Sequence, residues 1–144
     1  MNMLARAIEI ASKEFVNTLD KGGKPYILHC LWVMNRVRHL GENYMIVAVL
    51  HDLIEDTDWT IVGLKKEGFN NEVCLAIAAL THDRKVKYLT YIDNLKTNDL
   101  CVQVKLRDLE HNSKITRLKG INQKDIDRMV KYHEAYTHLK HLRK

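Results

Sequence analysis

The chain has 144 residues, 46% of them hydrophobic, and its 23 basic and 18 acidic side chains give a net charge of +5. This length suits one domain with a single hydrophobic core, and this composition argues against intrinsic disorder. With six glycines and one proline, the chain lacks the turn residues that a β-sandwich or β-barrel requires, so we expect an all-α fold.

Along the chain, apolar residues recur at helical spacing between short polar or glycine-containing segments. One amphipathic stripe covers residues 4–15, and a second helix is expected at 26–40, directly after Pro25. Residues 44–50 are apolar on all sides, which is typical of a central buried helix. The remaining expected helices are 61–66 (capped by Thr60, with Asp58 as the alternative cap), 72–80, 89–96, 99–118 and 124–139. The sequence therefore predicts a single-domain helical bundle over residues 1–144.

The cysteines indicate the cellular compartment of the protein, and the net charge indicates the kind of partner that it binds. Cys30, Cys74 and Cys101 form no Cys-x-x-Cys pair, so neither a disulfide framework nor a zinc ribbon is expected. Unpaired cysteines, no signal-peptide pattern and no long apolar run indicate a cytoplasmic protein without a membrane segment. The net charge of +5 favours an anionic partner, either nucleic acid or a phosphate-bearing small molecule.

The central helix ends in an unusual acidic segment. His51, Asp52, Glu55 and Asp56 are spaced three or four residues apart, so on a continuous helix they project toward one region. Such a group beside a buried helix is costly unless a cation pairs with it, and imidazole and carboxylate together suit Mn, Fe, Zn or Mg. The alternative is a solvated helix end, although acidic residues there oppose the helix dipole.

Two further helices carry matching residues. His29 lies among apolar residues of the second helix, where an isolated histidine is usually a hydrogen-bonded core residue. Asp108 lies in the 99–118 helix with Lys105 before it and Asn112 after it, on nearly the same face. Together, His29, His51, Asp52 and Asp108 supply nitrogen and oxygen donors from three helices.

The segments GGKPYILH (22–29), AVLHDLIEDTDWT (48–60) and KLRDLEHN (105–112) carry these residues in order. In this arrangement the chain resembles the HD-domain metal-dependent phosphohydrolases, and more narrowly the hydrolase domain of the Rel/SpoT enzymes. The resemblance implies an HD-type all-α bundle and removal of the 3′-pyrophosphate from guanosine tetra- or pentaphosphate. It also implies one Mn²⁺ ion held by four ligands: His29, His51, Asp52 and Asp108.

The resemblance assigns the remaining roles as well. Glu55 and Asp56 become an acid/base pair beside the attacking water, although they could instead orient His51. Asn112 becomes a nucleotide contact. An anionic substrate also needs cations, for which Lys21 and Lys105 are the expected contacts. His82 and His111 could reach a second metal ion.

The chain departs from the family pattern at Asp20, at Cys30 (usually proline) and at Ile115 (usually a small polar residue), and the first of these bears on the substrate. The long Rel/SpoT enzymes carry an Arg-Lys pair where this chain has Asp20 and Lys21, and their arginine packs against guanine. This departure leaves two alternatives open, namely another phosphorylated nucleotide as substrate, or a non-catalytic module that binds nucleotide or nucleic acid. The chain length leaves no room for a synthetase domain, so we expect any alarmone activity to run toward breakdown.

Overall fold

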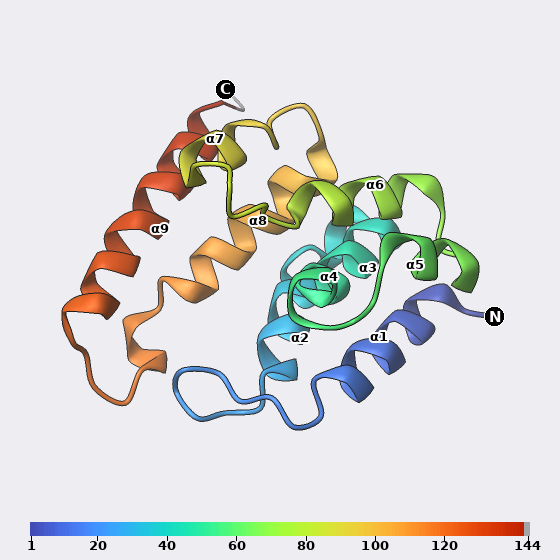
Figure 1. Ribbon diagram of the computed structural model, residues 1–144, viewed down its shortest axis with the longest axis horizontal. Coiled ribbons are helices and arrows are strands. Elements are labelled where there is room, and N and C mark those ends of the chain that lie inside the picture. Colours follow the sequence, from blue (N-terminus) through green and yellow to red (C-terminus); the bar gives the residue numbers. More distant parts are fainter. Residues whose placement is uncertain (143–144) are drawn as a thin grey trace.

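The computed structural model describes residues 1–142. Apart from an isolated bridge between Leu19 and Pro25, its regular structure in that range is helical, as Figure 1 shows. The all-α prediction is therefore confirmed. The helices are α1 (Met3–Glu14), α2 (Ile27–Arg36), α3 (Glu42–Leu50), α4 (Leu53–Asp56), α5 (Ile61–Glu67), α6 (Asn71–Leu80), α7 (Tyr88–Asp93), α8 (Asp99–Asn112) and α9 (Gln123–His141), with 3₁₀ turns η1 (Arg38–Leu40) and η2 (Ile115–Arg117).

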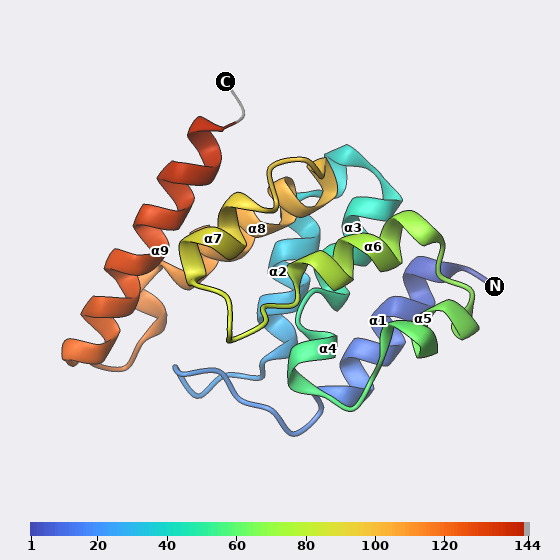
Figure 2. The same ribbon diagram turned by 45° about the horizontal axis from the view of Figure 1, so that its top comes forward.

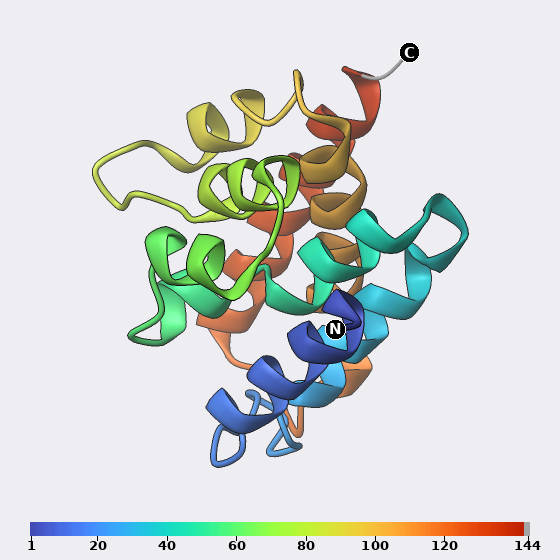
Figure 3. The same cartoon turned by 90° about the vertical axis from the view of Figure 1, so that its right-hand side faces the viewer.

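Helix α3 forms the centre of the bundle, as its apolar sequence predicts. Its last five residues, Ile46 to Leu50, are buried, and it packs against α1, α2, α6 and α8. In Figure 1, α3 lies between α6 and α1. Helix α9 lies at one edge, packed against α8 and α7, and Figures 2 and 3 show it on the side away from the N-terminus.

Polar caps begin most of the longer helices. The side chains of Asn2, Thr60, Asn70, Asn98 and Asn122 each accept a hydrogen bond from a backbone N–H in the first turn of the helix that follows. Each such cap stabilises the fold by about 1 kcal/mol. The cap predicted at Thr60 is confirmed. No helix among residues 1–142 is long and apolar enough to cross a membrane.

The sequence predicts one continuous helix through residues 44–56. This prediction is wrong at residues 51 and 52, where the helix is interrupted. Helix α3 ends at Leu50 and α4 begins at Leu53, because Asp52 takes φ −100° and ψ 0°. The Nδ1 atom of His51 lies 2.6 Å from the carbonyl oxygen of Ala48, an acceptor that an uninterrupted helix would use for its own backbone. The break lets two consecutive side chains, His51 and Asp52, reach the same site.

The helix expected at 99–118 is too long. Helix α8 ends at Asn112, and Lys114 is extended, with φ −76° and ψ 99°. The side chain of Arg117 turns back and donates to the carbonyl oxygen of His111 at 3.0 Å, which satisfies a helix-end carbonyl. A side chain five residues beyond the helix thus helps to end it, without the glycine or proline that would mark the boundary in the sequence.

Candidate functional site

Four donor side chains converge at the centre of the bundle. His29 comes from α2, His51 and Asp52 from the break between α3 and α4, and Asp108 from α8. One ligand atom from each residue lies within 4.8 Å of the others. The two histidines and Asp108 are buried, with at most 3% of their surface exposed, whereas Asp52 is partly buried. The structure therefore brings together the residues that the sequence predicts as metal ligands.

Asp108 lies at the centre of this cluster. Its Oδ1 atom lies 2.9 Å from Nε2 of His29 and 3.2 Å from Nε2 of His51. The same His51 nitrogen lies 3.0 Å from Oδ2 of Asp52. These Nε2 atoms and carboxylate oxygens all face one point, which is the arrangement that binds a cation.

Other groups hold the ligands in place, mostly through the atoms that face away from the cluster. Nδ1 of His51 faces the Ala48 carbonyl, as described above, and Nδ1 of His29 lies 2.7 Å from Nδ1 of His111. Lys105 donates to Oδ2 of Asp108 at 2.9 Å, and the hydroxyl of Tyr26 donates to Asp52. Partners of this kind fix the orientation of metal ligands and raise their affinity.

The electrostatics of the cluster favour a bound cation. Burial alone would raise the pKa of Asp108, but Lys105 and His51 hold it well below its usual range. Burial would lower the pKa of His51, yet Asp52 and Asp108 raise it well above its usual range. The site therefore keeps its carboxylates ionised and stabilises positive charge. Imidazole with carboxylate is a donor set for Mn, Fe, Zn or Mg, so the residues present fit a divalent metal.

Lys105 lies deeper than a surface cation. Its side chain is 13% exposed, and its ammonium lies 5.4 Å from the ring centre of Tyr91 and 6.0 Å from that of Tyr88. Its charge is already paired with Asp108, and that carboxylate raises the pKa of Lys105 against the effect of burial. The expected contact of Lys105 with a substrate stays a prediction.

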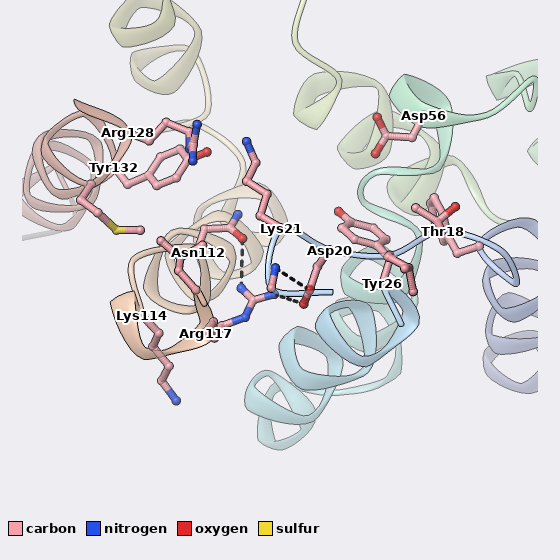
Figure 4. Close-up of a pocket in the computed structure, with 15 residues that line it drawn as sticks. Thr18, Asp20, Lys21, Tyr26, Asp56, Asn112, Lys114, Arg117, Arg128 and Tyr132 are labelled. Carbon is pink, nitrogen blue, oxygen red and sulfur yellow. Dashed lines mark hydrogen bonds and ion pairs between the residues drawn. The ribbon is translucent and has the colours of Figure 1, made fainter. Parts of the chain in front are cut away.

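A pocket of about 430 Å³ opens beside the cluster (Figure 4). Asp56, Asn112 and Lys21 line it, so three of the predicted catalytic and substrate-binding residues share one cavity. Asn112 also donates to Oδ1 of Asp108 at 3.0 Å, which joins the pocket to the cluster. The other lining residues come from the end of α1, the loop before α2, the segment after α8, and α9: Phe15, Thr18, Leu19, Asp20, Gly22, Tyr26, Lys114, Arg117, Leu118, Arg128, Met129 and Tyr132.

The loop before α2 is fixed by the residue that departs from the family pattern. One oxygen of Asp20 accepts from the backbone N–H groups of Gly22 and Lys24, each at 2.9 Å, and the other pairs with Arg117 at 3.1 Å. Figure 4 shows this ion pair on the pocket wall. A Cβ atom on Gly22 would lie 2.0 Å from the carbonyl oxygen of Arg117, so this close approach requires glycine.

Glu55 and Asp56 occupy different surroundings. The carboxylate of Glu55 accepts from the backbone N–H of His82 and so holds the segment after α6. Asp56 faces the pocket, where burial, Asp52 and Glu55 raise its pKa to about 6. Asp56 is therefore poised to exchange a proton near neutral pH.

The sequence alone missed several residues that the structure places at the site. Tyr26 lies within the segment 22–29, close to the predicted ligand His29, and that proximity is a usable signal. The sequence suggests His111 only as a ligand of a second metal ion, not as a neighbour of His29. Arg128 and Tyr132 come from α9. Nothing in their own segment separates them from the other polar residues of an amphipathic helix.

Known proteins resemble the chain in sequence and in structure. No family model matches it. It is 37% identical over 87 residues to a guanosine-3′,5′-bis(diphosphate) 3′-pyrophosphohydrolase of Aquifex aeolicus, an alignment that covers 59% of this chain and 12% of that protein. The identity is 33% over 103 residues to the protein of that name in Haemophilus influenzae, covering 62% of this chain and 15% of the relative. The chain thus spans a small part of the curated relatives it matches.

A solved structure matches nearly the whole chain. It is described as a metazoan ortholog of SpoT that hydrolyses ppGpp, and it aligns with a TM-score of 0.80 over 96% of this chain and 85% of that one. The resemblance to the Rel/SpoT-type hydrolases is confirmed. At 20% sequence identity, the structural match shows that the helical fold is the same.

Proposed function

We propose that the chain is a metal-dependent hydrolase that removes the 3′-pyrophosphate from guanosine tetra- or pentaphosphate and leaves GDP or GTP. The observation that carries this proposal is the four-donor cluster joined through Asn112 to a pocket that contains Asp56 and Lys21. The relatives named as 3′-pyrophosphohydrolases support the reaction, since the match covers more than half of this chain. In this proposal residues 1–144 act as one HD-type phosphohydrolase domain.

One Mn²⁺ ion is the proposed cofactor, held by His29, His51, Asp52 and Asp108. When bound, such an ion lowers the pKa of a water molecule and polarises a phosphoryl oxygen. The paired contacts of Asp108 with Lys105 and of His29 with His111 hold these ligands in place for it.

Asp56 is the proposed proton acceptor for the attacking water. Its pKa of about 6 leaves the carboxylate ionised at neutral pH, yet basic enough to take a proton. The water oxygen bonds to the phosphorus that is attached to the 3′-oxygen, and the bond between that phosphorus and the 3′-oxygen breaks with its electron pair on the oxygen. The 3′-oxygen then takes up a proton from solvent and becomes the 3′-hydroxyl of GDP or GTP. Glu55 supports this step because its charge helps to raise the pKa of Asp56.

Lys21 and Asn112 are the proposed nucleotide contacts. Lys21 extends into the same end of the pocket as Arg128, across from Asp56 (Figure 4), and these two cations give an anionic phosphate a counter-charge. The contact of Lys105 with the nucleotide remains a prediction, and its ammonium also pairs with Asp108. The proposed partner is a small phosphorylated nucleotide rather than nucleic acid, and three buried, unpaired cysteines support a cytoplasmic location.

The ion pair of Asp20 with Arg117 favours a second candidate, a hydrolase for another phosphorylated nucleotide. Asp20 cannot pack against guanine as the arginine of the long enzymes does, and its carboxylate is already paired. The reaction class would stay the same while the base could differ.

A panel of phosphorylated nucleotides tests both candidates. The protein with Mn²⁺ is incubated with guanosine tetraphosphate, its adenosine counterpart, GTP and GMP, and the products are resolved by anion-exchange chromatography. Pyrophosphate released from guanosine tetraphosphate alone supports the first candidate. Faster hydrolysis of another nucleotide favours the second, and binding without hydrolysis of any of them would contradict both.

A further inference from the structure

His111 contacts a candidate metal ligand although it is not itself part of the donor cluster. It lies on α8 three residues after Asp108 and is 9% exposed. Its ring stacks on Trp32, with 4.2 Å between centroids and 14° between planes, and lies nearly parallel to the ring of His29. Arg117 donates to its backbone carbonyl. The two ring contacts, with Trp32 and His29, hold the imidazole in one orientation.

The contact between the two histidines needs a single proton. Nδ1 of His29 and Nδ1 of His111 are 2.7 Å apart, a distance at which two lone pairs or two N–H groups would repel. One nitrogen must therefore donate and the other must accept. A neutral imidazole carries one proton, so the choice made at Nδ1 of His29 decides the state of its Nε2 atom.

Whether the proton of His29 lies on Nδ1 or on Nε2 matters for metal binding, because Nε2 faces the donor cluster. Nε2 of His29 faces the donor cluster, 2.9 Å from Oδ1 of Asp108. To bind a cation there, Nε2 must present a lone pair, which requires the proton to lie on Nδ1. His51 meets the same requirement with the Ala48 carbonyl, a backbone acceptor. At Nδ1 of His29, the neighbouring group is a side chain, His111, instead of a backbone carbonyl.

We infer that His111 is a positioning residue for the metal centre: its Nδ1 accepts the Nδ1–H of His29 and so directs the lone pair of His29 Nε2 at the metal ion. This inference rests on the metal centre of the proposed function but not on the substrate or the reaction. It also gives His111 a task other than binding a second ion, because its Nδ1 atom is already engaged. His82, the other histidine considered for a second ion, has Nε2 2.8 Å from the carbonyl oxygen of Val86.

Two substitutions separate hydrogen bonding from packing. His111→Asn keeps an acceptor near the Nδ1 position, whereas His111→Phe keeps an aromatic ring against Trp32 and removes the acceptor. Mn²⁺ affinity is measured by electron paramagnetic resonance of the free ion. We expect His111→Phe to weaken Mn²⁺ binding by about 10–100-fold, as loss of such ligand-orienting groups does elsewhere. His111→Asn should stay close to the wild type. Wild-type affinity in a folded His111→Phe protein, or equal loss in both variants, would overturn the inference.

A measurement on the unaltered protein is independent of how the variants fold. With ¹⁵N-labelled histidine and diamagnetic Zn²⁺, NMR reports the tautomer of each ring and the N–N coupling across their hydrogen bond. The inference predicts the proton on Nδ1 of His29, coupled to Nδ1 of His111. A proton on Nδ1 of His111 would overturn it. Failure to release pyrophosphate from a metal-loaded protein would contradict the proposed reaction alone, since these readouts contain no nucleotide.

Discussion

Asp20 and Arg117 form an ion pair across the pocket wall, with 3.1 Å between Oδ2 and Nη2. Arg117 also lies 3.4 Å from Oδ1 of Asn112, whose amide donates to Asp108. The loop before α2 is thereby connected through α8 to a candidate metal ligand. At the position where the long Rel/SpoT enzymes have an arginine, this chain has a carboxylate that organises the pocket wall.

Replacing Asp20 should weaken substrate binding more than the chemical step. In Asp20→Ala the loop loses two backbone hydrogen bonds and the ion pair, while the ligand cluster keeps its contacts. We expect KM for guanosine tetraphosphate to rise by about tenfold, which corresponds to about 1.4 kcal/mol, with a smaller change in kcat. Asp127→Ala is the control, because Asp127 accepts from Gln123 on the exposed face of α9. An unchanged KM in Asp20→Ala would contradict this role.

The sequence predicts which residues form the ligand cluster but not which segments form the walls of the pocket. His29, His51, Asp52 and Asp108 could be grouped because the three segments that carry them resemble, in the same order, those of the HD-type phosphohydrolases; helical spacing alone does not bring the consecutive side chains of His51 and Asp52 to one point. The break at Asp52 and the early end of α8 escape prediction, since both depend on contacts with atoms outside the local repeat. Arg128 and Tyr132 reach the pocket only because α9 folds back against α8, a long-range contact that no local pattern encodes.

Adding a methyl group to Gly22 should disturb the same wall. The Cβ atom of Gly22→Ala would meet the Arg117 carbonyl at 2.0 Å, so one of the two segments must move. Forced overpacking of this kind costs about 1–3 kcal/mol, and we expect a lower Tm together with a higher KM. Gly120→Ala is the matched control, since its Cβ atom would have nothing within 4 Å. If both variants melt and bind like the wild type, the loop does not pack on Arg117 as described.

Removing the charge of Asp56 should stabilise the metal-free protein at high pH. Its folded pKa of about 6 lies above the ordinary value of 3.8, so folding loses stability as pH rises through 6. Asp56→Asn lacks this penalty. Because Asp56 is exposed to solvent in the pocket, we expect a gain of about 1 kcal/mol at pH 8 and none near pH 4. Urea unfolding in EDTA at both pH values measures it, and a stabilisation that does not depend on pH would contradict the assigned cause.

Metal binding should stabilise the fold through the cluster. A ligand present at 100 times its Kd stabilises a protein by about 2.7 kcal/mol, which is about 5–10 °C in Tm for a domain of this size. We expect Mn²⁺ to raise Tm by that amount and EDTA to reverse it. Asp108→Asn should abolish the response because it removes the carboxylate at the centre of the cluster. A response that survives this substitution would place the ion elsewhere.

The most direct test of the proposed function is pyrophosphate release from guanosine tetraphosphate by metal-loaded protein, compared between the wild type and Asp56→Asn. Both proteins should bind one Mn²⁺ ion. The wild type should release pyrophosphate and GDP in equal amounts, and Asp56→Asn should be about 10²–10⁴-fold slower, as expected when a positioned acid/base group is lost. A wild-type protein that binds Mn²⁺ and the nucleotide yet releases no pyrophosphate would contradict the proposed function.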